Sequence, residues 1–398
     1  MLQSPWCFKM GLVNRMNFKL LNNIWVRAAV ILVVLIGGFF FLRAYNQVEK
    51  PMLVNTQGRT FEQATVVEII QDNIQENGSR VGDQIVKLRM ESGPQKGQII
   101  EANSPNGLLF GAACEPGMSV ITISSLVGQL DVTTVYNVDR TVPIYIFIGS
   151  FLLLLCIIGG KKGFKSAVAL IFSFICFIWL FFPMIMRGIS PFLAAIITCT
   201  IVIAATICLI NGFTIKALNA ILATFFGLLT AGIAADVFGH ATILSGYNVS
   251  NIESLIFIGQ NTLIDVGQIL FAGVLFASLG AVMDIAMDVS SAVNEIHHKN
   301  PAMPPLELFK SGMNVGRDVM GTMATTLILA FFGGSLGTWV LNYVYDLPYL
   351  QLINSNSIGI EILQGISGSF GVIFTVPLVA AFSAWLPHFI ESRRGDSK

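Results

Sequence analysis

The sequence has little charge for its length. Only 12% of its 398 residues are Asp, Glu, Lys or Arg, while 54% are hydrophobic. Ordinary soluble domains carry roughly 25% charged residues, and a single soluble core of this size could not bury so much apolar surface. A basic surplus is also missing, because 23 Lys and Arg balance 23 Asp and Glu, which argues against a nucleic-acid binder. The composition therefore predicts a multi-spanning membrane protein.

Metal and cofactor motifs are missing as well. The cysteines have neither the spacing of a metal site nor that of a disulfide framework. They are Cys7, Cys114, Cys156, Cys176, Cys199 and Cys208. The sequence contains no H-E-x-x-H, no nucleotide-binding loop and no ATPase motif. We expect no bound cofactor and leave a metal open.

Long apolar runs are what the sequence does contain. A helix needs about 20 apolar residues to cross a bilayer, and eight runs approach or exceed that length. They cover residues 24–42, 143–160, 166–183, 191–210, 217–238, 266–288, 319–342 and 357–387. The expected fold is a polytopic α-helical membrane protein with about eight transmembrane helices.

The runs divide the chain into five parts. A basic flank without a small-x-small cleavage site marks the first run as an uncleaved signal anchor, and Met10 or Met16 are alternative translation starts to Met1. The expected parts are a tail 1–23, the signal-anchor helix 24–42, a β domain 43–142, a seven-helix membrane domain 143–387 and a tail 388–398.

The distribution of basic residues predicts the orientation. With alternating spans, fourteen Lys and Arg fall on one side, whereas the short loops of the other side contain only Arg187. Positive residues are retained on the cytoplasmic side. We therefore expect both termini in the cytoplasm and the 43–142 segment outside it.

The 43–142 segment alternates like a β domain. In Val86–Glu91 the apolar and charged side chains take opposite faces, and a Gly/Pro turn follows at 92–97. Further strands are expected at 65–70, 98–101, 118–124 and 132–138. Five short strands suggest a small OB-like β-barrel between the first two helices, and sandwich-like folds stay open.

Three segments resemble a known family. Gly280–Ala286, Val315–Asp318 and Thr326–Ala330 are similar to the YibE/F-like family of bacterial membrane proteins, and the resemblance extends from about residue 60 through the seven later spans. It implies a bacterial plasma-membrane location and this topology, and it implies no mechanism and no functional residues.

Acids within the sixth run are the first candidate site. Asp284 and Asp288 are four residues apart and share one helical face, which continues through Gly280, Ala277 and Gly273. A stripe of small residues is typical of a helix packed against its neighbours. Ionisable side chains inside a bilayer usually face protein or water, so we expect both acids at the cytoplasmic end of the bundle interior.

The start of the seventh run adds Arg317 and Asp318. Arg317 suits pairing with Asp284 or Asp288, and the face of Asp318 continues through Thr322 and Thr325. Three acidic side chains beside one Arg would leave a net negative charge, which would favour the binding of a proton or a metal cation. The alternative is a structural cluster in which headgroup water solvates Asp288 and Asp318 caps its helix.

Glu361 is the remaining candidate, about one turn inside the outer end of the last run. Its face carries Gly365, Gly368 and Ser369, which allow a close approach or a break in the helix. The segment 251–259 is apolar but too short to span, and is expected to be interfacial or re-entrant. Residues 306–310 are expected to form a short interfacial helix.

These patterns favour an integral plasma-membrane secondary transporter or permease for a small cation or proton-coupled solute. Asp284, Asp288, Arg317, Asp318 and Glu361 would contact the ion or substrate, and the lipid bilayer is the partner. One alternative is a membrane-anchored accessory protein whose β domain 43–142 binds an envelope protein. Another is an intramembrane hydrolase, based on Gly333-x-Ser335-x-Gly337, although a glycine-rich packing face explains that motif better.

Overall fold

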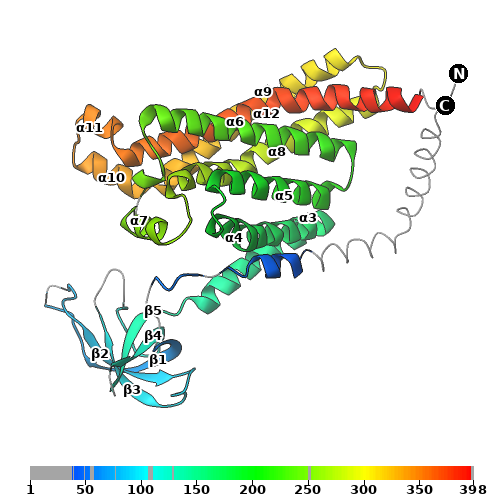
Figure 1. Cartoon of the computed structure of the whole chain (residues 1–398). Helices are drawn as coiled ribbons and strands as arrows, with labels where there is room; N and C mark the ends of the chain where they lie inside the picture. The colour runs from blue at the N-terminus through cyan, green and yellow to red at the C-terminus, as the bar shows by residue number, and fades with distance from the viewer. Residues whose placement is uncertain are drawn as a thin grey trace. The chain divides into compact units, whose positions relative to one another are not determined.

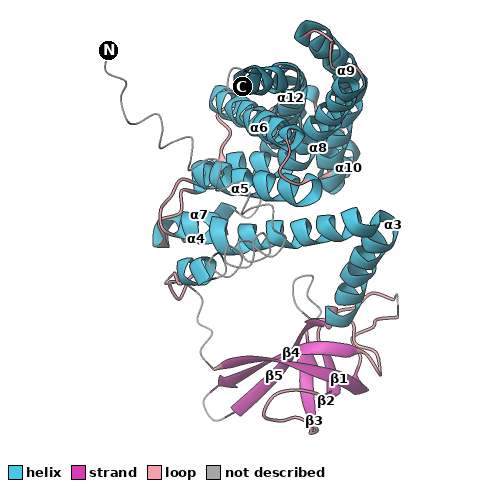
Figure 2. Ribbon diagram, turned by 90° about the vertical axis from the view of Figure 1, so that its right-hand side faces the viewer, coloured by secondary structure: helices cyan, strands magenta, loops and turns pink. Residues whose placement is uncertain are grey.

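A computed structural model describes residues 38–395 except 39, 49, 54–57, 77, 106–110, 128–129 and 250–251. The chain forms two compact units, one of residues 52–160 and one of residues up to 51 together with 161–398 (Figures 1 and 2). The expected tail 1–23 and most of the signal anchor 24–42 lie outside the described residues, and residues 40–45 are helical.

The first unit contains a closed five-stranded barrel (Figure 2). Its strands are β1 (Arg59–Gln71), β2 (Gln84–Met90), β3 (Ile99–Ser104), β4 (Ser119–Val127) and β5 (Leu130–Val138). Their order around the barrel is β1-β2-β3-β5-β4, with β4 paired to β1, and β3 and β5 are the parallel pair. All five strands expected from the alternation are confirmed.

The barrel closes around a small apolar core. Alternate residues of β1 and β2 point inward, among them Val66, Val86 and Leu88, and all three are buried. Cys114 is also buried there, and this burial raises the pKa of its thiol. The thiol therefore behaves as a core group and is not activated.

The expected second and third spans form one helical run. The run Thr141–Met186 consists of α3 (Thr141–Cys176), a π-helical turn η1 (Phe177–Phe181) and α4 (Phe182–Met186). Its kink lies at Gly160, with φ 53° and ψ −132°, a conformation that suits only glycine. The run accounts for the difference between the seven spans expected after the anchor and the six helices in the described residues that are long and apolar enough to cross a membrane.

The other long helices begin and end where local signals place them. They are α5 (Pro191–Asn211), α6 (Ile215–Thr242), α8 (Ile269–Lys299), α9 (Pro305–Gly334) and α12 (Asn356–Gly395). The hydroxyls of Ser190 and Thr214 cap α5 and α6, and Gly212 with φ 74° ends α5. The helix α12 packs most extensively on α6 and α9, and then on α8 (Figure 1).

Several expected boundaries are wrong. The segment 289–318, between the expected spans 266–288 and 319–342, is mostly helix, because α8 continues to Lys299 and α9 begins at Pro305. The expected interfacial helix at 306–310 is the first part of α9. The expected span 319–342 breaks at Ser335, after which α10 (Leu336–Val344) is a separate helix. The expected tail 388–398 is helical as far as Gly395.

Short elements fill the end of the helical unit where α6 finishes and α12 begins. They are η2 (Gly246–Asn248), α7 (Ile252–Asn261), η3 (Val266–Gln268) and α11 (Tyr349–Ile353). The helix α7 corresponds to the expected interfacial or re-entrant segment, and none of its residues is buried. Gly246 is needed where it stands, because a side chain there would collide with the backbone carbonyl of Val266.

Candidate functional site

The acidic face of α8 is exposed in the described structure. Asp284 and Asp288 are exposed on the same side as Ala277 and Gly280. A side chain at Gly280 or Gly273 would meet no atom within 4 Å. The expectation that this stripe packs against neighbouring helices is therefore wrong, because α8 packs through its opposite, β-branched face.

That opposite face explains the orientation of the acids. Its buried residues include Val274, Val282, Ile285, Val289 and Val293, which continue one apolar stripe along the whole helix. Since the stripe repeats at helical spacing, burying it turns residues 284 and 288 outward.

Both acids lie well inside the helix instead of at its end. The 31 residues of α8 span about 46 Å, which exceeds the roughly 30 Å of a bilayer's hydrocarbon core. Eleven residues follow Asp288 before α8 ends at Lys299. At least one end of α8 must therefore project from the membrane, and the polar end at Glu295–Lys299 is the better suited one.

The helix α9 runs antiparallel to α8 and brings Arg317 to the level of the acids. Gly312 of α9 lies against Val293, and Leu327 lies with Ser278 against Gly368 of α12. Arg317 lies between these two contacts on α9, at about the same height along the helix pair as Asp288 on α8. Among the described residues, however, no ion pair within 4.0 Å joins Arg317 to Asp284 or Asp288.

The predicted Arg317 ion pair is absent because α9 packs through its glycines. A side chain at Gly312 would collide with Val293, and one at Gly316 would collide with Val376. The close approach on that face turns Arg317 and Asp318 outward, and both are exposed. Thr322 and Thr325, on the face of Asp318, donate their hydroxyls to the carbonyls of Val319 and Gly321 of their own helix, each at 2.8 Å.

Glu361 belongs to a different part of the bundle. Val282 of α8 lies against Gly371, ten residues beyond Glu361 on α12, which separates Glu361 from the acidic face of α8 by about 15 Å along the helix axis. The Glu361 carboxylate is half-buried and accepts a hydrogen bond of 2.5 Å from the indole N–H of Trp339 in α10. Phe332 packs on Trp339 with ring centroids 5.2 Å apart.

The sequence did not point to Trp339. It lies on a separate short helix, 22 residues before Glu361, and no spacing rule connects two helices across a bend. The only available signal was an aromatic residue with an N–H donor in the segment before Glu361. The structure thus divides the five predicted residues into an exposed group on α8 and α9 and a separate carboxylate held by an indole.

The described residues give little support for a metal site or for a hydrolase site. No group of three or more His, Cys, Asp or Glu side chains in that part of the chain could hold a metal ion. Ser335 ends α9, and none of its described hydrogen bonds joins its hydroxyl to a base. His240, the candidate base for such a hydrolase, has its Nε2 3.6 Å from a carboxylate oxygen of Asp236 on the same helix, and both side chains are exposed.

Comparison with known proteins gives a family and no closer relative. No curated protein and no solved structure has a significant match to this chain. The family of YibE/F-like proteins matches residues 147–388. The match covers the helical segment from α3 to α12 and excludes the barrel strands, so it is narrower than the resemblance expected from about residue 60. The chain belongs to the family of YibE/F-like proteins.

Proposed function

We propose that the helical unit is a secondary transporter or permease of the bacterial plasma membrane, for a small cation or a solute coupled to protons. The observation that carries the proposal is the exposed pair Asp284 and Asp288 on α8, a helix long and apolar enough to span. A charged side chain within a membrane-spanning helix is unfavourable, so an acidic face toward the cytoplasmic end of such a helix is retained where it borders water or protein.

The neighbouring residues suit a cation path. Asp284, Asp288 and Asp318 together exceed the charge of Arg317 by two, and a net negative wall raises the local cation concentration. Gly280, one turn before Asp284, leaves open space beside it. Glu361, held by Trp339, offers a second carboxylate farther along the bundle. Since the sequence has no ATPase motif, we propose an ion gradient as the energy source.

The test is ion flux through the full-length protein in liposomes loaded with a pH-sensitive dye. After a proton, Na⁺ or K⁺ gradient is imposed, Asp284→Asn and Asp288→Asn should each slow the flux about tenfold, or ~1.4 kcal/mol of barrier. Glu295→Gln is the matched control, because Glu295 is an exposed acid of the same helix, 3.5 Å from Lys299. Unchanged flux in both Asn variants, or wild-type liposomes no faster than empty ones, would refute the proposal.

We also propose that both termini are cytoplasmic and that the barrel is an OB-type domain on the outer side. The barrel's strand order supports the OB assignment, and Lys161, Lys162 and Lys165 after the kink support the orientation. A protease site inserted after Lys96, in the exposed β2–β3 turn, should be cut by protease added to spheroplasts, whereas green fluorescent protein fused to the C-terminus should fluoresce. Protection of the inserted site would contradict this orientation.

A further inference from the structure

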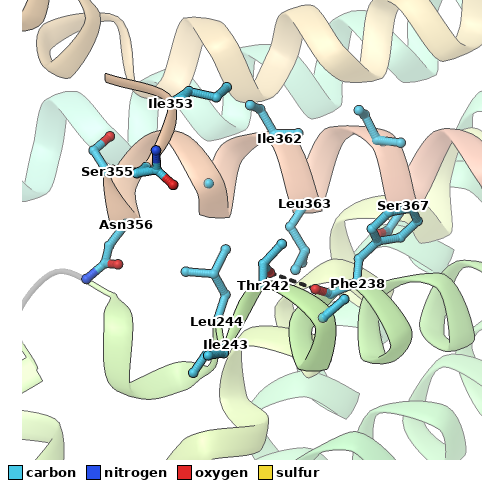
Figure 3. A pocket seen from close by; sticks show the side chains of 14 residues that line it. Phe238, Thr242, Ile243, Leu244, Ile353, Ser355, Asn356, Ile362, Leu363 and Ser367 are labelled. Atoms are coloured by element: carbon cyan, nitrogen blue, oxygen red, sulfur yellow. Dashed lines mark hydrogen bonds between the residues drawn. The ribbon is translucent and has the colours of Figure 1, made fainter. Parts of the chain in front are cut away.

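A cavity of about 570 Å³ lies where α6 ends and α12 begins (Figure 3). Its wall is formed by α6, the segment after it, α11 and the first turns of α12. None of the 14 lining residues is charged, and most are apolar. The volume falls within the range of small-molecule sites, and the lining excludes an ionic ligand.

One polar group in this wall has no partner. Ser367 is only 1% exposed, and its hydroxyl oxygen makes no hydrogen bond. The other hydroxyls nearby are satisfied: Thr242 donates to the carbonyl of Phe238 at 2.6 Å, and Ser369 donates to that of Gly365 at 2.8 Å. A buried hydroxyl without a partner is unfavourable, so a ligand oxygen that reaches Ser367 would satisfy it.

The cavity is elongated along α12. Figure 3 shows Ser367 and Phe238 at one end and Ser355 and Asn356 at the other. Eleven residues separate Asn356 from Ser367, a rise of about 16 Å along the helix. The shape suits a chain-like molecule with its body against Phe238 and Leu363.

This site is distinct from the proposed ion path. Glu361 lies on roughly the opposite face of α12 from Gly359, Leu363 and Ile366, which line the cavity. Asp284 and Asp288 are also absent from its wall. A ligand here would therefore bind whether or not the acids conduct ions.

We propose that the cavity binds an uncharged, largely apolar organic molecule whose hydroxyl or carbonyl oxygen forms a hydrogen bond with the hydroxyl of Ser367. The apolar body fills the space between α6 and α12, where burial of apolar surface drives binding. Selectivity against anions and cations follows from the uncharged wall, which would have to desolvate them without a counter-charge.

The probe is 1-octanol carrying a diazirine on its chain, applied to the full-length protein in nanodiscs. Photolabelling should map to the cavity wall and be displaced by unlabelled 1-octanol but not by octanoate. Ser367→Ala should weaken displacement by octanol about three- to tenfold, the worth of one neutral hydrogen bond, and leave displacement by octane unchanged. Ser369→Ala is the matched control, since that hydroxyl is bonded to the carbonyl of Gly365 at 2.8 Å and to that of Ala324 in α9 at 3.4 Å, and it does not line the cavity.

A second variant tests whether the ligand occupies the cavity. Ile362→Trp should fill the cavity and abolish labelling, whereas Ile373→Trp, at a similarly exposed position of α12 outside the cavity, should leave labelling unchanged. Labelling elsewhere, or equal displacement by octanol in wild type and Ser367→Ala, would overturn the proposal. A diazirine phospholipid that labels the wall and resists octanol would also overturn it, because the cavity would then be a slot for bilayer lipid.

Discussion

Ile243 is a β-branched residue in a backbone conformation that favours glycine. It directly follows α6 and has φ 57° and ψ 35°, the left-handed conformation with which many helices end. Its N–H bonds back to the last turn of α6, to Gly239 and His240, so the conformation serves the cap. A β-branched side chain is strained there, and that of Ile243, 86% exposed, gains little packing in return.

We expect Ile243→Gly to stabilise the protein, because glycine adopts the left-handed cap without strain. The gain should be about 1 kcal/mol, measured as a rise in the thermal midpoint of the helical unit in detergent. Ile233→Gly is the control: this isoleucine is also exposed but lies inside α6, where glycine should destabilise by about 1 kcal/mol. A lower midpoint for Ile243→Gly would show that its side chain has an unrecognised contact.

At this scale the sequence predicts which residues share a face but not which face is buried. The spacing of Asp284 and Asp288 correctly placed them together on α8. Their exposure depends on the competing stripe of Val282, Ile285 and Val289, which has more apolar surface to bury. The contact between Trp339 and Glu361 joins two helices whose relative position no local pattern encodes.

The ends of the helices are also difficult to predict from the sequence. Residues 289–299 and 305–318 contain enough polar side chains to suggest a loop, yet Val289, Val293, Leu308 and Gly312 keep the helical period and are buried. The mean hydropathy of these segments is low, and it does not reveal that their apolar residues recur at helical spacing. The helices α8 and α9 consequently extend beyond the length that a bilayer requires.

The two helices α9 and α12 are held close by glycine, which yields a paired prediction. Gly316→Ala places a Cβ against the side chain of Val376 and should destabilise the helical unit by about 1–3 kcal/mol. Gly321→Ala, five residues later and on another face of α9, meets open space and should stabilise it by about 0.5–1 kcal/mol, since alanine is the better helix former. Thermal unfolding of both variants in detergent measures the difference in sign; two shifts of the same sign would contradict the packing of α9 on α12.

At the scale of the whole molecule, two kinds of sequence pattern specify two separate cores. Alternation with period two predicted all five strands, because each half-buried strand carries its own signal. Long apolar runs predicted the helices but not how the second and third expected spans connect, which meet directly at the non-helical backbone of Gly160 without a loop between them. Each core cluster consists of residues from one unit only.

The separate cores predict two independent unfolding steps in the intact chain. Gln84 is fully buried in the barrel, where its side chain accepts from the N–H of Cys114 at 2.7 Å and donates to Asp72 at 2.9 Å. Gln84→Ala leaves that N–H unpaired and a void beside it, so it should destabilise the barrel by about 2–3 kcal/mol. The measurement is calorimetry of the full-length protein in detergent, followed by maleimide labelling of Cys114, whose buried thiol should react only after the barrel opens.

The decisive comparison is the double variant Gln84→Ala with Gly316→Ala. Groups that share no packing partners contribute additively to stability, usually within about 0.5 kcal/mol. We therefore expect Gln84→Ala to lower only the transition that exposes Cys114, Gly316→Ala to lower only the other, and the double variant to show both shifts unchanged. A single transition that moves with either substitution would mean that the barrel and the helical unit fold as one cooperative body.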